Sequence, residues 1–541
     1  MIIPPVFNLP LMYAETHYRF KYFFSLLKKA EPEILADVPY RLEPDAALPI
    51  LLIVKDSNAY PVELVSVKID IWQDEHKLSV EGNDFPEHIA RPFWWKIIRV
   101  TLEKELKEIF GFLDVDVTFE YRVGGKIRTC RNDNYRTSSR KQFRVYRSRN
   151  PLPTVTGCIQ GDAHTHSSYT DDQVEFGSPV EASVEMSKSM GLSFFCVTDH
   201  SYDLDDRIDN YLINDPSLPK WKLLQSEIDK INDQHKDFAV IRGEEVSCFN
   251  RMRRNVHLLL WGTRKFFNGS GDSAEKWFHT KAEHTIREIL DAVESGTVAY
   301  AGHPTERAPF FQWLLIRRGE WGLDDMNEAG LFGIQILNGV INEAFADGLE
   351  QWKVLLLRGK RTFIAAGDDA HGNFNRFRQI GIPFVSLREN HLQLFAKMRT
   401  LITCDAVSED SVLTSLREGR SAITNGPVIA AKMANEFQEL ASFGQSIRGK
   451  RLQIQLTGQS SEEFGSFHEI RLIIGIIGSG NEIIKKLNQC VSRYYFDVRI
   501  DFEIPRPHAS CYIRFEGFTE GGVHDNGKGI CYTNPIWIIA S

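Results

Sequence analysis

The stretch Gly161-Asp162-Ala163-His164-Thr165-His166 follows an apolar-leaning segment at residues 155–159. On an extended chain, residues two apart project from the same face, so His164 and His166 can reach one ion. Imidazole nitrogen and carboxylate oxygen together suit Zn, Mn or Fe, whereas an all-oxygen set favours Ca or Mg. The stretch therefore predicts a strand that ends in a hydrolytic metal centre.

Further possible metal ligands follow in order, each near the end of an expected strand. They are Thr198-Asp199-His200, Gly243-Glu244-Glu245, His257, His303-Pro304 and Asp369-Ala370-His371. A lone histidine in an apolar run, such as His257, is more often a buried core residue than a ligand. The ordered set reverses that preference and favours metal binding.

Strand and helix patterns alternate from residue 156 to about residue 430. Repeated strand-helix units predict a parallel sheet closed as a barrel, with function at the carboxyl ends of the strands. The predicted strands span 193–198, 238–242, 256–261, 297–301, 333–337 and 362–366. The predicted helices span 178–191, 220–235, 281–294 and 343–357.

The flanking segments follow a different pattern, so we expect three domains: 1–155, 156–430 and 431–541. After a mixed helical pattern at 18–35, alternation of Val65, Val67, Ile69 and Ile71 with polar residues predicts a β-rich N-terminal domain. The basic stretch 122–149 is interpreted as an exposed connection. Alternation at 452–456 and 496–504 predicts a C-terminal antiparallel β domain.

With these motifs in this order, the chain resembles the PHP (polymerase and histidinol phosphatase) metallohydrolases over about residues 158–430. The resemblance implies an α/β fold, an irregular seven-stranded (β/α) barrel flanked by β-rich domains. The segments 416–427 and 534–537 resemble the branch that includes carbaryl hydrolases and phosphoesterases.

The resemblance also implies a set of nine ligands for two to three divalent ions of Zn, Mn or Fe. The set is His164, His166, Asp172, His200, Glu245, His257, His303, Asp369 and His371. Glu245, His200 and Asp369 are the expected catalytic residues, with Glu245 bridging two ions. Asp171 competes with Asp172 for the third ion, and Asp199 either orients an imidazole or is a turn residue.

Three divalent ions and three carboxylates leave an excess of positive charge, which suits a bridging hydroxide and an anionic substrate. We therefore expect a phosphoesterase acting on a small phosphate ester. The alternatives are a carboxyl- or carbamate-ester hydrolase and a non-catalytic PHP interaction module. Arg251, Arg253, Arg254 and Arg307 are expected to bind the substrate, although a solvated basic loop is an equal alternative.

Composition excludes several classes of protein. A chain of 541 residues exceeds one ordinary core. Its net charge of -8, from 64 basic and 72 acidic side chains without a long basic block, argues against a nucleic-acid partner. The absence of a signal-peptide pattern and of a long apolar run predicts a soluble cytoplasmic protein without a membrane partner. The oligomeric state stays open.

Overall fold

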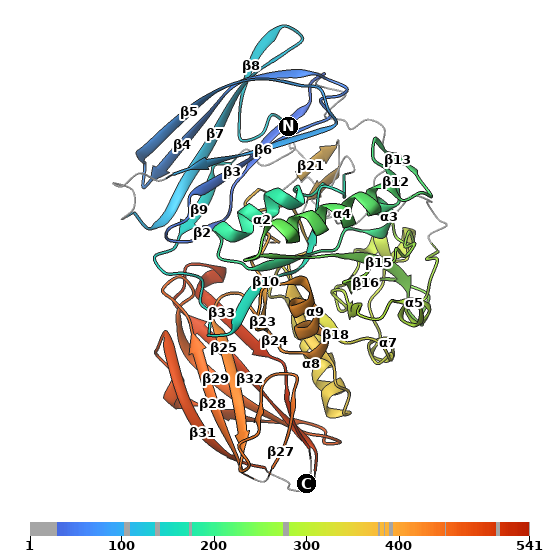
Figure 1. The fold of residues 1–541 in the computed structure, drawn as a ribbon, viewed down its shortest axis with the longest axis vertical. Helices are drawn as coiled ribbons and strands as arrows, with labels where there is room; N and C mark the ends of the chain where they lie inside the picture. Colours follow the sequence, from blue (N-terminus) through green and yellow to red (C-terminus); the bar gives the residue numbers. More distant parts are fainter. Residues whose placement is uncertain are drawn as a thin grey trace, which may run out of the picture.

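The structure is a computed structural model that describes residues 30–101, 109–135, 141–171, 176–273, 281–376, 379–382, 385–388, 393–449, 451–504 and 509–539. Strands from the N-terminal part lie at one end of the molecule and strands from the C-terminal part at the other (Figure 1). Between them lies a central layer that contains most of the helices. This central layer carries all the motifs that predict metal binding.

The N-terminal part forms two sheets, with strand orders β1-β3-β6 and β2-β9-β7-β4-β5, and β8 pairs with β7. Their strands are β1 (Glu33–Asp37), β2 (Arg41–Leu42), β3 (Leu48–Lys55), β4 (Val62–Gln73), β5 (His76–Ile89), β6 (Phe93–Val100), β7 (Gly111–Val123), β8 (Lys126–Arg131) and β9 (Phe143–Arg147). Val67, Ile69 and Ile71 of β4 are buried as the alternation predicts. A register shift between Leu64 and Ser66 takes Val65 out of this pattern.

Two local predictions for this part are wrong. Residues 33–35 lie in strand β1 rather than in a helix, and residues 18–29 of that pattern lie outside the described residues. The basic stretch 122–149 contains β8 and β9, so it is a pair of sheet strands rather than a connection. Exposed strands carry basic side chains on their solvent-facing side, and the sequence of this stretch therefore resembles that of a loop.

The first sheet of the central layer runs β14-β11-β10-β23-β24 and continues through β33, β32, β29 and β30, with β20 paired to β10. Strand β10 pairs parallel with β11 and β20 but antiparallel with β23. The strands are β10 (Cys158–His166), β11 (Phe194–Val197), β14 (Ala239–Ile241), β20 (Ala370–His371), β23 (Arg399–Thr403), β24 (Ser421–Thr424), β29 (Ser466–Ile476), β30 (Glu482–Lys486), β32 (Cys511–Glu520) and β33 (Lys528–Thr533). Pairing of β24 with β33 carries the sheet across residue 430.

The second central sheet has the order β15-β16-β17-β18-β19. Its strands are β15 (Gly243–Phe249), β16 (Asn255–Trp261), β17 (Val298–Ala301), β18 (Gly333–Asn338) and β19 (Phe363–Gly367). The first two strand pairs are antiparallel and the last two are parallel. A single parallel bridge between His200 and Glu245 joins this sheet to the first one.

The prediction of a closed seven-stranded (β/α) barrel is therefore wrong. The described strands of the central layer form two sheets that mix parallel and antiparallel pairs. The turn at residues 250–254 joins β15 to β16, and a connection this short permits only antiparallel pairing. Buried strands of either kind have nearly continuous apolar sequences, so the sequence pattern did not reveal the pairing direction.

Helices cover the central strands, and Figure 1 shows α2 and α4 running across the middle of the molecule. The described helices are α2 (Val180–Ser189), α3 (Ser201–Leu204), α4 (Pro219–Gln234), α5 (Ile286–Ala292), α6 (Phe310–Leu315), α7 (Leu323–Met326), α8 (Glu343–Leu357) and α9 (Glu409–Glu418). Helix α8 has the predicted bounds. Helix α5 is shorter than predicted because a capping box between Thr285 and Glu288 begins it later.

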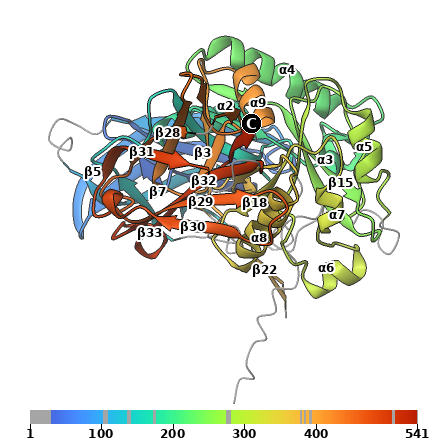
Figure 2. The same cartoon turned by 90° about the horizontal axis from the view of Figure 1, so that it is seen from below.

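The C-terminal part adds a sheet of order β26-β25-β28-β31, and β27 and β34 extend the long sheet beside β32. These strands are β25 (Val428–Asn435), β26 (Leu440–Ala441), β27 (Ser446–Arg448), β28 (Arg451–Gln459), β31 (Tyr495–Glu503) and β34 (Ile536–Ile539). One core cluster contains buried residues of both sheets. Seen from below, β28, β31, β29 and β32 lie beside one another (Figure 2). The three-domain division stays a prediction.

Two short hairpins lie outside these sheets. They are β12 (Asp206–Arg207) with β13 (Asn210–Asn214), and β21 (Gln379–Ile382) with β22 (Val385–Arg388). Among the helices that the structure describes, none combines the length and the apolar character needed to cross a bilayer.

Candidate metal centre

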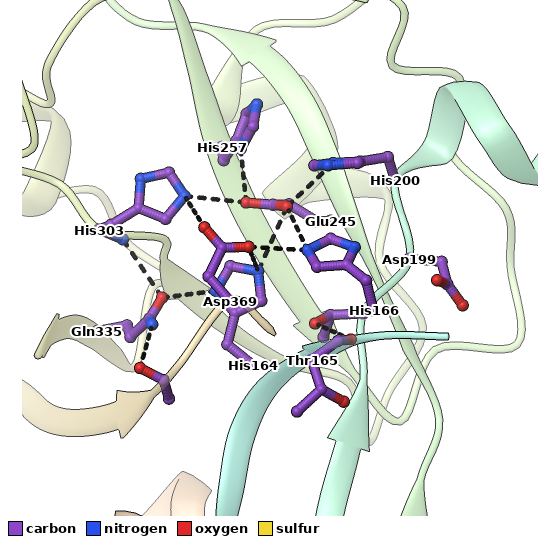
Figure 3. A network of polar contacts seen from close by, with 12 residues as sticks. His164, Thr165, His166, Asp199, His200, Glu245, His257, His303, Gln335 and Asp369 are labelled. Carbon is purple, nitrogen blue, oxygen red and sulfur yellow. Dashed lines mark hydrogen bonds and ion pairs between the residues drawn. The ribbon is translucent and has the colours of Figure 1, made fainter. Parts of the chain in front are cut away.

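Residues from both central sheets converge on one buried cluster (Figure 3). Eight of the nine predicted ligands are described, and all eight are buried; Asp172 lies outside the described residues. His164 and His166 end β10, His200 follows β11, Glu245 lies on β15 and His257 on β16. His303 follows β17, Asp369 follows β19 and His371 ends β20.

Glu245 lies at the centre of the cluster. Its Oε1 is 2.5 Å from His257 Nδ1 and 3.1 Å from His303 Nε2. Its Oε2 is 3.0 Å from His200 Nδ1, 3.3 Å from His164 Nε2 and 3.5 Å from His166 Nε2. One carboxylate therefore faces five imidazoles, with both of its oxygens close to ring nitrogens.

Asp369 faces Glu245 across the two histidines of β10. Its Oδ1 is 2.9 Å from His166 Nε2 and 3.4 Å from His164 Nε2. Parallel pairing of β20 with β10 places His371 beside His166, and their rings stack with centroids 4.3 Å apart. The nitrogen and oxygen atoms form three overlapping groups whose ligand atoms lie within 4.8 Å of one another: His164, His166, Glu245 and Asp369; His200, Glu245 and His257; and His166, His200 and His371.

Strand alternation explains why Glu245, and not Glu244, enters the cluster. Glu244 points to the other face of β15, where its Oε1 accepts a hydrogen bond from the backbone N–H of Phe267 at 2.9 Å. Burial raises the pKa of Glu244 well above its usual value, although the Phe267 N–H lowers it. The two adjacent buried glutamates therefore have different surroundings, and Glu244 accepts its hydrogen bond away from the cluster.

The backbone at two of these positions lies in the left-handed region. His303 has a φ of 24° and Asp369 has a φ of 54°. Such conformations cost about 1 to 3 kcal/mol in a non-glycine residue and cluster at ligand-binding sites. Gly367 keeps Asp369 close to β10, because a Cβ at position 367 would lie 2.5 Å from the backbone nitrogen of His164.

Charges in the cluster are strongly coupled. Burial raises the pKa of Glu245, but His257, His164 and other imidazoles outweigh it and hold the pKa well below its usual value. Burial lowers the pKa of His164, but Asp369 and Glu245 outweigh it and raise the pKa to about 10. Metal ligation requires neutral imidazoles, so a bound ion would displace protons from the cluster.

Several buried ligand atoms lack a hydrogen bond among the described residues. They include His164 Nε2, both ring nitrogens of His200 and Glu245 Oε2. His200 Nδ1 lies close to Glu245 Oε2 but the pair lacks hydrogen-bond geometry. Buried polar atoms normally have partners, and an ion coordinated at about 2.1 Å would satisfy these. The residues present therefore fit a metal centre.

Sequence reasoning missed three residues that surround the ligands. Gln335 of β18 accepts a hydrogen bond from His164 Nδ1–H at 2.8 Å through its Oε1, and so leaves Nε2 facing the carboxylates. Asp272 Oδ2 is 3.0 Å from His257 Nε2, and Arg318 Nη1 donates to the same oxygen at 2.6 Å. A carboxylate on the outer nitrogen of a histidine is the usual arrangement around a metal ligand. In the sequence, Gln335, Asp272 and Arg318 are marked only by being polar residues near apolar strands.

We expect Asp272→Asn to weaken metal binding by about 10- to 100-fold, because the amide no longer holds His257 with Nδ1 directed at Glu245. Chelator competition on the folded variant measures this loss. Ser247→Ala is the matched control, since it removes the hydroxyl donor to Asp272 and keeps the carboxylate beside His257. Unchanged affinity in Asp272→Asn would contradict the role given to Asp272.

Asp199 is hydrogen-bonded to the loop that follows β10, and among the described residues no hydrogen bond joins it to an imidazole. Its carboxylate accepts hydrogen bonds from the backbone N–H and the hydroxyl of Ser167, both at 2.6 Å, and from the hydroxyl of Thr170 at 3.0 Å. Burial raises the pKa of Asp199 to about 6, although the hydrogen bonds from Ser167 and Thr170 lower it. Asp199 therefore fixes the loop that leaves β10 after His166.

The predicted substrate-binding arginines have surface partners. Arg251 is 60% exposed and pairs with Glu328 at 2.6 Å, and Arg307 is 69% exposed and pairs with Asp347 at 3.4 Å. Arg254 donates to the carbonyl of Trp313 at 2.8 Å and lies over its ring. Arg253 is exposed in the same turn. The structure therefore supplies no contact between these arginines and the cluster, among the residues it describes.

No family model and no curated protein matches the chain. Solved structures that match include a β-glucuronidase from Parabacteroides merdae, with 9% identity, 94% of this chain and 65% of that chain covered, and a TM-score of 0.19. They also include a β-D-mannosidase from Dictyoglomus thermophilum, with 9% identity, 93% of this chain and 66% of that chain covered, and a TM-score of 0.21. The chain thus spans about two thirds of the length of these proteins.

These results correct the family assignment. The assignment to the PHP metallohydrolases required a (β/α) barrel, and the described strands instead form mixed and antiparallel sheets in a β-rich molecule. The phosphoesterase prediction, its carboxyl- and carbamate-ester alternatives and the PHP interaction module rested on that family, so we do not retain them.

Proposed function

We propose that the cluster binds two to three divalent ions of Zn, Mn or Fe and that the protein is a metal-dependent hydrolase. The observation that carries this proposal is the position of Glu245, a fully buried carboxylate within 3.5 Å of five imidazoles. Structural zinc sites are usually closed by four ligands, often thiolates. A larger set of histidines around shared carboxylates suits a catalytic centre with several ions.

The three overlapping groups supply the ligands for these ions. His164, His166, Glu245 and Asp369 form the most complete group, with two nitrogen and two oxygen donors. His200, Glu245 and His257 form the second group, and His303 Nε2 adjoins it at 3.1 Å from Glu245 Oε1. His166, His200 and His371 form the third. Glu245, His166 and His200 each belong to two groups, so the ions would share ligands.

Bound ions of this kind polarise a substrate oxygen and lower the pKa of water to about 7. Beside the cluster, a cavity of about 10 Å³ is lined by His303, Glu306, Asn338 and their neighbours, which is space for about one water molecule. Asn338 Nδ2 donates to Glu306 Oε2 at 3.1 Å and to Asp369 Oδ2 at 3.3 Å. Glu306 is therefore positioned to accept a proton from a water held in this cavity.

The proposal predicts two to three equivalents of metal in purified protein, measured by elemental analysis after expression with added Zn, Mn or Fe. Metal-depleted protein should lose hydrolytic activity on a panel of chromogenic substrates with different scissile bonds, and restored metal should return it. Less than one equivalent after supplementation would contradict metal binding. Activity that survives full depletion would contradict metal dependence.

A further inference from the structure

A buried carboxylate of the N-terminal part reaches the loop that follows His371. Asp37, the last residue of β1, is fully buried. Its Oδ2 accepts a hydrogen bond from the backbone N–H of Phe374 at 3.0 Å, and its Oδ1 accepts from those of Asn375 at 3.0 Å and Arg376 at 3.1 Å. Three successive N–H groups that converge on one anion form a nest, which fixes the backbone that donates them.

The same segment is held from the central layer at the two residues before the nest. The hydroxyl of Ser178 donates to the carbonyl of Gly372 at 3.0 Å, and the backbone N–H of Phe395 donates to the carbonyl of Asn373 at 2.8 Å. Gly372 has a φ of 62°, and a Cβ there would lie 2.1 Å from the backbone nitrogen of Ser178. The chain from His371 to Arg376 is thus clamped between two parts of the molecule.

Further contacts strengthen the clamp on the N-terminal side. Arg376 Nε lies 3.3 Å from Asp37 Oδ2, and the Arg376 guanidinium lies over the ring of Phe176. Asn375 Nδ2 donates to the carbonyl of Arg144 in β9 at 2.9 Å. An uncompensated carboxylate would be costly in this dry position, so the carboxylate and the nest stabilise each other.

We propose that Asp37 is a positioning residue of the metal centre, and that the N-terminal part completes the centre by fixing the loop that carries His371. This inference rests on the proposed function. His371 joins β10 through a two-residue parallel pairing and stacks on His166, so its position depends on where the loop runs next. Loss of the contacts between Asp37 and this loop would allow His371 to move, whereas the two ligand groups that contain Glu245 would stay in place.

The test compares Asp37→Asn with wild type in the full chain. The amide keeps the size of the side chain but directs its NH₂ group at backbone donors, so the nest is broken. We expect the variant to lose one equivalent of metal, or to release one ion to a chelator at least about tenfold faster, with the remaining ions unaffected. Arg99→Ala is the matched control, because it removes an exposed contact between β6 and Glu185 of α2 and leaves the clamp intact.

Hydrogen exchange of the peptide 371–376 separates this inference from the proposed function. The amides of Phe374, Asn375 and Arg376 should exchange at least about tenfold faster in Asp37→Asn, whether or not metal binds. If the wild-type protein binds no metal, the proposed function and this inference are both refuted. Faster hydrogen exchange in Asp37→Asn would still show that Asp37 fixes the loop. Full metal content, unchanged release and unchanged exchange in folded Asp37→Asn would overturn the inference. If Asp37→Asn fails to fold, the variant Asn375→Ala is tested in its place. Faster ion release from Asn375→Ala than from Arg99→Ala supports the proposal, and equal release refutes it.

Discussion

Glu245→Gln should remove more than one equivalent of metal from the protein, the largest loss expected from any single substitution in the cluster. Both oxygens of Glu245 face imidazoles, and the two groups with carboxylate ligands share this residue. An amide offers one weaker acceptor and a nitrogen that repels the cation, so two ions lose a ligand together. Elemental analysis of protein purified with added metal measures the effect.

Glu244→Gln is the matched control for this substitution. Glu244 is the adjacent residue and is equally buried, and burial raises its pKa well above the usual value, which favours the uncharged form. The amide should therefore replace it with little effect on metal content. Equal metal loss in both variants would indicate general damage to β15 and would contradict the bridging role of Glu245.

Glu463→Gln should cause the largest loss of stability outside the cluster, about 3 to 5 kcal/mol. Arg41 of β2 and Glu463, which lies between β28 and β29, form a bidentate pair with both contacts at 2.9 Å and both side chains 1% exposed. Arg41 also donates to the carbonyl of Met190 after α2 at 2.5 Å. The pair thus joins all three parts of the chain, and its loss leaves a buried guanidinium charge without its main partner.

The pH dependence of protein stability gives a second test of the pair formed by Arg41 and Glu463. Burial raises the pKa of Glu463, but Arg41 and His524 outweigh it and lower the pKa from 4.5 to about 2. Because the pKa of Glu463 is lower in the folded state than in the unfolded state, ionised Glu463 contributes its full stabilisation above about pH 4.5. This stabilisation is lost as the pH falls toward 2. Thermal melts between pH 7 and 3 should show this acid loss in wild type and a smaller one in the variant. Asp209→Asn, which breaks the exposed pair with Arg207, is the control and should leave the melting temperature unchanged.

Part of the candidate cluster could be predicted from local spacing in the sequence. Two residues apart on a strand, His164 and His166 share a face, and the structure shows both in the cluster. The same alternation separates Glu245 from Glu244. The strand period shows only that one of the two glutamates can enter the cluster; the choice of Glu245 and the set of nine ligands came from the family resemblance.

The sheet arrangement could not be found in the same way. Strand β16 is buried along its whole length, and its largely apolar run is compatible with parallel or antiparallel neighbours. The barrel was predicted from the alternation of strand and helix patterns as well as from the family resemblance, and the barrel and the family assignment were both wrong. Residues that act through others, such as Asp272, Gln335 and Asp37, were missed because a single polar residue has no periodicity to mark it.

The substrate-binding role of the arginines stays a prediction. Arg251 and Arg254 follow Glu245 in the sequence, which suggested a position at the mouth of the site. In the structure Arg251 pairs with Glu328, and Arg254 packs on Trp313. Both partners are distant in sequence, and only the folded chain reveals them.

Anomalous diffraction from crystals grown with Zn or Mn tests the central claim most directly. We expect peaks at about 2.1 Å from the ligand nitrogen and oxygen atoms, with the strongest peak among His164, His166, Glu245 and Asp369 and a second between Glu245 and His257. Crystals of metal-loaded protein with no anomalous peak within the cluster, or with metal bound only at surface residues, would contradict the account.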